Sequence, residues 1–168
     1  MLYFLSTINK FDHPKSQMPI IKRSPMNLVS TIVQNFFDGF EESSNTLNLE
    51  LLGSQYGDSF MFAGRAGAIS IKKDDFLKVL PKRYGFFKTI GLVSSKITAI
   101  EETQLDKNYF LVRVNWEMRF EKDGDQPLRE MTSATYVLIQ KEDSLQIVFQ
   151  LDHQDLIERT KELGLLPS

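Results

Sequence analysis

Residues 150–155 could do chemistry most directly, because an acid and an imidazole stand side by side there, Asp152 and His153. Either side chain could act as a general base if an apolar surrounding tuned its pKa. A structural interpretation competes, in which Asp152 caps the amino end of a last helix and Asp155 occupies its first turn. Adjacent strand residues also point to opposite faces, so the pair need not cooperate. The structural interpretation is favoured, and Asp152 is the first residue to test for catalysis.

An apolar stripe on one strand could line a binding site. Trp116, Met118 and Phe120 alternate with polar residues, as expected for one face of a sheet. Small-molecule pockets are mostly hydrophobic, but a plain core explains the same pattern and is favoured. The opposite face of this strand is expected to pair across the sheet or to meet another subunit, and it carries Arg113, Asn115, Glu117 and Arg119.

Other patterns favour ordinary structure over chemistry. The mixed basic and aromatic segment 82–88 could hold phosphates and bases, but it also completes an amphipathic helix, which is favoured. The loop 64–67 is too short for a phosphate loop and lacks its Lys-Ser/Thr. We find no convincing metal-ligand spacing and no serine nucleophile motif. Any catalysis is therefore expected to use acid–base chemistry without a cofactor.

The composition indicates one ordinary globular domain. The 168 residues, 42% of them hydrophobic and 25% charged, fit a single chain of domain size with a real core. A formal charge of −2 gives no general attraction to nucleic acid or to an anionic membrane. The absence of cysteine removes disulfide scaffolds and fits a reducing interior. With no apolar stretch near membrane-spanning length, a cytoplasmic location is expected, with neither membrane nor nucleic acid as partner.

The order of elements predicts an α+β domain. Three prolines without periodicity make residues 1–25 a flexible arm, before a single domain over residues 26–168. The spacing of apolar residues predicts a helix from Met26, and Asn48 looks like the N-cap of a second. Further elements are a short strand at 59–63, a helix at 73–90 that Pro81 restarts or kinks, strands at 93–105, 112–120, 128–140 and 144–151, and a last helix at 153–163.

The last strand leaves open which of its faces looks inward. Either Leu145, Ile147, Phe149 and Leu151 face the helices, or Gln146, Val148, Gln150 and Asp152 do. The second choice would give a more polar interior, and the family resemblance described below favours it.

This succession resembles the nuclear transport factor 2-like superfamily, which includes ketosteroid isomerases and polyketide cyclases. The resemblance covers roughly residues 26–152 and rests on the long first helix, the segment 56–64, the helix at 73–90 and the sheet. It implies a cone-shaped, cystatin-like domain with a curved antiparallel sheet, N-terminal helices covering that sheet, and frequent homodimers through the exposed sheet face. The pocket residues that it implies are Tyr56, Phe60, Phe62, Trp116, Met118, Tyr136, Val148 and Gln150.

The residues disfavour the ketosteroid isomerase reaction. Its base would fall near Ala63 or Gly64, its oxyanion acid would fall near Thr135, and the first helix offers phenylalanines instead of a tyrosine. A paired-histidine mechanism like that of scytalone dehydratase also fails, since only His13 and His153 exist. Polyketide cyclase relatives place an acid on the late strands, which leaves Asp152 and its neighbour His153 as candidate catalytic residues.

Two hypotheses of different classes follow. In the first, a homodimer binds a small, largely apolar molecule in the cone, and any reaction on it is of the isomerase, cyclase or dehydratase type. In the second, the domain is a non-catalytic dimerisation or protein-interaction module. An open pocket with an inward carboxylate would favour the first, whereas a pocket plugged by Phe and Trp would favour the second.

Overall fold

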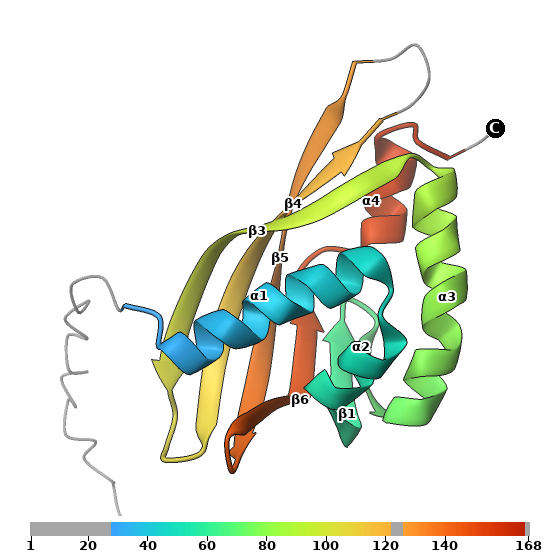
Figure 1. Ribbon diagram of the computed structural model, residues 1–168. Coiled ribbons are helices and arrows are strands. Elements are labelled where there is room, and N and C mark those ends of the chain that lie inside the picture. The colour runs from blue at the N-terminus through green and yellow to red at the C-terminus, as the bar shows by residue number, and fades with distance from the viewer. Residues whose placement is uncertain (1–27, 122–125, 167–168) are drawn as a thin grey trace, which may run out of the picture.

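The computed structural model describes residues 28–121 and 126–166 (Figure 1). The arm expected over residues 1–25 lies outside them. The elements in chain order are α1 (Thr31–Thr46), α2 (Leu49–Gln55), β1 (Tyr56–Gly64), β2 (Gly67–Lys72), α3 (Lys73–Thr89), β3 (Leu92–Gln104), β4 (Tyr109–Phe120), β5 (Leu128–Lys141), β6 (Ser144–Asp152) and α4 (Leu156–Glu162). The expected α+β class, with a curved sheet under N-terminal helices and a short C-terminal helix, is confirmed.

The sheet has six strands in the order β2-β1-β6-β5-β4-β3. All neighbours are antiparallel except β1 and β6, which run parallel. The short strand expected at 59–63 is longer, since β1 spans Tyr56–Gly64, and it lies inside the sheet between β2 and β6. The edge position is taken by β2, which the sequence analysis did not predict; all but one of its residues are exposed, so the strand has no buried apolar face. Gly67 starts β2 with a positive φ of 115°, a conformation that glycine adopts easily in a tight turn.

Helix α3 joins the two edges of the sheet. It follows β2 directly and leads into β3, and it contacts both of these edge strands as well as β1. Such contacts require the sheet to curl, so that its edges approach a single helix of about 25 Å (Figure 1). The helix runs through Pro81 without restarting, which excludes one of the two expected effects of this proline. No described helix is both long and apolar enough to cross a membrane.

The core lies between α1 and the inner face of the sheet. Val33 and Phe37 on α1 are fully buried and meet Val112 and Val114 on β4, which are also fully buried. The ring of Phe37 lies 5.3 Å from that of Tyr136, and aromatic pairs at this separation add to area burial. The helix begins at Thr31, later than the expected Met26, but the helical spacing of its apolar residues predicts the correct inward stripe.

Two side chains of α1 hold the irregular edge strand β3. The register of β3 against β4 shifts twice, once near Ser94 and again between Ile97 and Ala99. Asn45 accepts a hydrogen bond from the Ser95 N–H at 2.8 Å and donates one to the Ser95 carbonyl at 2.7 Å. Glu41 accepts from the Ile97 N–H. These contacts satisfy edge backbone groups and keep β3 bent toward α1.

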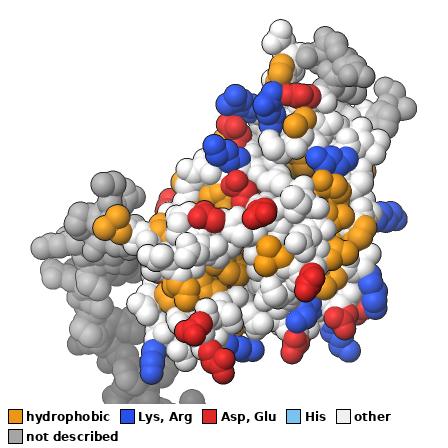
Figure 2. Space-filling model, in the orientation of Figure 1, with side chains coloured by type: hydrophobic (Ala, Val, Ile, Leu, Met, Phe, Trp, Pro, Cys, Tyr) orange, Lys and Arg blue, Asp and Glu red, His pale blue; other side chains and the backbone are white. Residues whose placement is uncertain are grey.

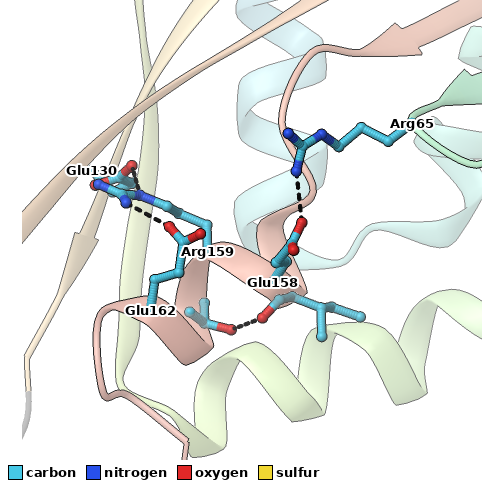
Figure 3. A network of polar contacts seen from close by, with 7 residues as sticks. Arg65, Glu130, Glu158, Arg159 and Glu162 are labelled. Atoms are coloured by element: carbon cyan, nitrogen blue, oxygen red, sulfur yellow. Dashed lines mark hydrogen bonds and ion pairs between the residues drawn. The ribbon is translucent and has the colours of Figure 1, made fainter.

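Helix α4 starts later than expected. Its N-cap is Asp155, whose carboxylate accepts from the backbone N–H groups of Ile157 and Glu158, so Asp152 is not the cap but the last residue of β6. Ion pairs then attach α4 to distant segments (Figure 3). Arg65 in the β1–β2 turn contacts Glu158 at 2.7 Å, and Arg159 contacts Glu130 on β5 at 2.6 Å.

Candidate functional site

A cavity of about 470 Å³ lies between the inner face of the sheet and residues of helices α1, α2, α3 and α4. This volume is within the range of about 300–1,000 Å³ that is typical of small-molecule sites. Most of its wall is apolar and includes Phe40, Leu52, Phe62, Ile71, Phe76 and Trp116. Its polar members include Tyr56, Tyr136, Gln150, Asp152 and Arg83.

One face of α3 lines the cavity instead of filling it. The lining residues of this helix recur at spacings of three and four, as expected for a single helix face, and they are Phe76, Val79, Leu80, Arg83, Tyr84 and Phe87. Of these, only Phe87 is buried. Figure 2 shows hydrophobic side chains gathered over α3 with Lys and Arg side chains beside them, and Val79 there is 57% exposed.

A β-bulge at Val148 decides which residues of β6 enter the cavity. Leu138 on β5 pairs with Ile147, but the adjacent Val137 pairs with Phe149, so Val148 is an extra residue in the strand. Before the bulge, Ile147 and its inward neighbour Leu145 are buried in the core. After it the inward positions become even-numbered, so Gln150 and Asp152 face the cavity. Each of the two alternatives for this strand therefore holds for one half of it.

A chain of hydrogen bonds connects the polar groups of this wall. The Tyr56 hydroxyl donates to Gln150 Oε1 at 2.7 Å, and Gln150 Nε2 donates to Asp152 Oδ1 at 2.8 Å. The amide of Gln150 is thereby held in one orientation, and the second carboxylate oxygen of Asp152 has no hydrogen-bond partner among the described residues. It is available to a bound molecule.

The protein environment makes Asp152 harder to ionise. Burial raises the pKa of this carboxyl above its ordinary value of 3.8, because a charge loses hydration there. The hydrogen bond from Gln150, then the positive charge of Arg83 and that of His153, act in the opposite direction without cancelling the effect. A carboxyl whose pKa moves toward neutrality is better suited to exchanging protons with a substrate.

Two tyrosines complete the polar wall as neutral groups. Burial raises the pKa of the hydroxyls of both Tyr56 and Tyr136, and the nearby Asp152 carboxylate adds to this effect. The proximity of Trp116 acts weakly in the opposite direction on the pKa of Tyr136. A neutral tyrosine hydroxyl keeps its proton and can donate it to a molecule in the cavity.

Most of the residues expected in the pocket line this cavity. Those that do are Tyr56, Phe62, Trp116, Met118, Tyr136 and Gln150, together with the catalytic candidate Asp152. Phe60 does not line it, because the ring is packed behind the wall, 4.6 Å from Tyr56 and 5.1 Å from Phe76. Val148 does not line it either, because it is the bulged residue.

His153 lies outside the cavity. Its Nε2 atom is 2.8 Å from Oγ1 of Thr135 in an exposed contact, while Asp152 turns inward. The pair therefore does not act on one site, as the alternation of strand residues indicates. Ala63 and Thr135, the positions expected for the ketosteroid isomerase acids, do not line the cavity.

Arg83 lies in the segment 82–88, which the sequence analysis interpreted as part of an amphipathic helix and did not place in the pocket. Among the described lining residues, it is the only cation and Asp152 is the only acid. A signal was present, because Arg83 falls on the same helical stripe as Phe76, Leu80 and Phe87. Within the described ranges, no group of three or more His, Cys, Asp or Glu residues could hold a metal ion.

The sequence matches no family model and no curated protein. Solved structures do match. A protein of unknown function from Shewanella oneidensis, described as NTF-2 like, has a TM-score of 0.59 and 18% identity over 73% of this chain and 97% of that chain. Aln2 from Streptomyces has a TM-score of 0.63 and 12% identity over 80% and 99%. The beta subunit of benzoate 1,2-dioxygenase from Burkholderia mallei has a TM-score of 0.57 and 14% identity over 79% and 95%.

The fold is nuclear transport factor 2-like. The resemblance inferred from the sequence is confirmed at this level, and another similar structure is described as having a cystatin-like fold. Identities of this size show the architecture alone, because a nuclear transport factor 2-like scaffold carries unrelated activities in proteins of different description. The function must therefore be argued from the residues that line this particular cavity.

The burial of Asp152 predicts a pH-dependent effect of the substitution Asp152→Asn. The pKa of the Asp152 carboxyl is higher in the folded state than in the unfolded state. At pH values between these two pKa values, the folded state therefore binds more protons than the unfolded state. Stability of the wild type is therefore lost as pH rises through that interval. The introduced amide cannot ionise, and its oxygen still accepts from Gln150. The gain in free energy of unfolding of the variant over the wild type, measured by chemical denaturation, should increase from pH 4 to pH 7, with a slope of at most about 1.4 kcal/mol per pH unit.

The control is Asp143→Asn on the exposed turn between β5 and β6, which should follow the wild type at every pH. The groups facing Asp152 from neighbouring elements, Arg83, Tyr56 and Tyr136, are unchanged in both variants. If Asp152→Asn and the wild type differed by the same free energy of unfolding at every pH from 4 to 7, the argument from burial would be contradicted.

Proposed function

We propose that the chain binds a small, largely apolar molecule in the cavity between the sheet and α3. One observation carries this proposal: the cavity is open, at about 470 Å³, and the carboxyl of Asp152 lines it. The rings of Phe40, Phe62 and Trp116 form parts of its wall instead of plugging it. That arrangement favours binding with chemistry over a purely structural module. The proposal includes a cytoplasmic location, which rests on composition alone.

The proposal further assigns acid–base chemistry without a cofactor to Asp152. Its carboxylate would remove a proton from a carbon next to a carbonyl group, and the hydroxyl of Tyr136 would donate to the carbonyl oxygen as negative charge develops there. Asp152 would then return the proton to the same or a neighbouring carbon, so that no oxidant or external acid is consumed. The reaction is of the type that isomerases and cyclases use. The raised pKa of Asp152 and the neutral state of Tyr136 both support these roles.

A homodimer through the outer face of the sheet is the second part of the proposal. No described helix covers this face (Figure 1). It combines half-buried apolar side chains such as Val137 with charges of both signs, including Arg129 and Glu117 at 3.5 Å. A second copy of the chain would present the same mixture, and a surface with both signs can complement itself around a two-fold axis. A non-catalytic interaction module would use this face without the cavity.

A larger side chain in the cavity should weaken the binding of a neutral probe. Thr132 lines the cavity on β5, and its neighbour Met131 points to the opposite face with 52% exposure. We expect Thr132→Trp to weaken binding of N-phenyl-1-naphthylamine about 10-fold or more, because the indole takes its space. The matched control Met131→Trp should leave the Kd within about two-fold. Fluorescence titration measures both, and equal Kd values for the two variants would place the probe elsewhere.

Exchange of carbon-bound hydrogen tests the chemistry. In heavy water, the protein should incorporate deuterium beside the carbonyl of at least one member of a library of apolar ketones, as detected by mass spectrometry. Asp152→Asn should slow this exchange about 100-fold or more, because the base is lost. Tyr136→Phe should slow it about 100-fold by removing the donor to the oxygen. Asp143→Asn should exchange at the wild-type rate. A protein that binds the probe but exchanges no ketone would contradict the catalytic part and leave the binding part standing.

Native mass spectrometry tests the dimer. The expected species has twice the 19.4 kDa mass of one chain, and it should lose any noncovalent ligand only on activation. Val137→Glu would place a charge in the middle of the outer face and should shift the population to monomer. Lys82→Glu, on the exposed side of α3, should remain a dimer. A wild-type monomer at micromolar concentration would contradict this part of the proposal.

A further inference from the structure

Arg83 occupies a position where an apolar residue would ordinarily stand. The stripe of α3 that faces the cavity is otherwise aromatic or aliphatic, with Phe76 and Leu80 before it and Phe87 after it. Both Arg83 and its neighbour Lys82 are exposed, but only Arg83 lines the cavity. The charge of Arg83 is therefore accessible from the solvent and from the cavity, as expected for a residue at the mouth of a binding site.

The guanidinium of Arg83 is positioned but not neutralised. It lies 5.4 Å from the centroid of the Phe87 ring, a contact that orients the group by attraction between a cation and the ring face. Among the described residues it forms no ion pair. Its charge nevertheless reaches the polar wall, since it lowers the pKa of both Asp152 and Tyr56 against the larger effect of burial. The cation, the carboxyl and the phenol hydroxyl therefore face a common space.

We propose that the molecule bound in this cavity is an apolar carboxylic acid, whose carboxylate pairs with Arg83 while its hydrocarbon body lies against Phe40, Phe62 and Trp116. This inference rests on the proposed binding function and specifies its ligand class. A guanidinium can hold a carboxylate through two parallel hydrogen bonds, which fixes orientation as well as position. One arginine matches one negative charge. A phosphate ester would bring nearly two charges into a cavity that also contains Asp152.

Substitutions at Asp152 and at Arg83 should change the affinity for a carboxylic acid in opposite directions. When ionised, this carboxyl repels a ligand carboxylate in the cavity, whereas Arg83 attracts it. Replacing the acid with a neutral amide should therefore strengthen binding of an acid and leave binding of a neutral analogue unchanged. Opposite responses at two residues of one wall would not arise from a general loss of structure.

The experiment compares naphthalene-2-carboxylic acid with its methyl ester as competitors of N-phenyl-1-naphthylamine at pH 7.5 and low salt. The wild type should bind the acid about 10-fold or more tightly than the ester, because a charged hydrogen-bonded pair forms. Arg83→Met, which keeps an apolar stem, should remove this preference and leave the affinity for the ester unchanged. Arg83→Lys should retain part of the preference, and Asp152→Asn should increase it. Lys82→Met is the matched control on the same helix and should behave as the wild type.

The melting temperature of each variant is measured to detect a folding defect. If Arg83→Met is destabilised, the test uses the acid-over-ester preference of Arg83→Lys instead. Equal affinities of the wild type for acid and ester would overturn the inference, as would a preference that survives Arg83→Met. In both cases binding of the neutral probe would leave the proposed binding function intact. Failure of the wild type to bind the probe, the acid and the ester would overturn the inference together with the proposed function.

Discussion

The contact of one helix with both edges of the sheet shapes the rest of this molecule. Helix α3 follows edge strand β2 and precedes edge strand β3, so the sheet has to curl until a single helix reaches both. A helix that spans a curled sheet cannot also sink into its middle, and of the α3 residues only Phe87 is buried. The space left beneath the helix is the cavity. Helix α1 packs the other part of the sheet tightly, so core and cavity are side by side on one face.

A single inserted residue in β6 changes which of its side chains face the cavity. Without Val148, the face of β6 that buries Leu145 and Ile147 would continue as Phe149 and Leu151, and the wall of the cavity would be apolar. The bulge reverses the alternation and directs Gln150 and Asp152 inward instead. The hydrogen bond of Gln150 to Tyr56 then ties this segment to the start of β1, which is the parallel neighbour of β6.

The electrostatics of the cavity follow from this arrangement. Burial disfavours the charged forms of Asp152, Tyr56 and Tyr136, while the guanidinium of Arg83, which forms no ion pair with the described residues, favours negative charge nearby. Proteins as different in description as a dioxygenase beta subunit and Aln2 share the fold. The distinguishing information therefore lies in a few lining residues and not in the architecture.

The sequence by itself determined the elements whose signals are local. Asn48 caps α2 as expected, and the alternation around Trp116 defines β4. It did not determine which residues of β6 point inward, the N-cap of α4 at Asp155 or the position of Arg83 in the cavity wall. Both phases of β6 have acceptable alternation, and only pairing with β5 reveals the extra residue Val148. Arg83 looks like one more surface cation until the curl of the sheet leaves a cavity beneath α3. Local propensity acts over neighbouring residues, whereas a bulge and a cavity arise from contacts between segments that are distant in the chain.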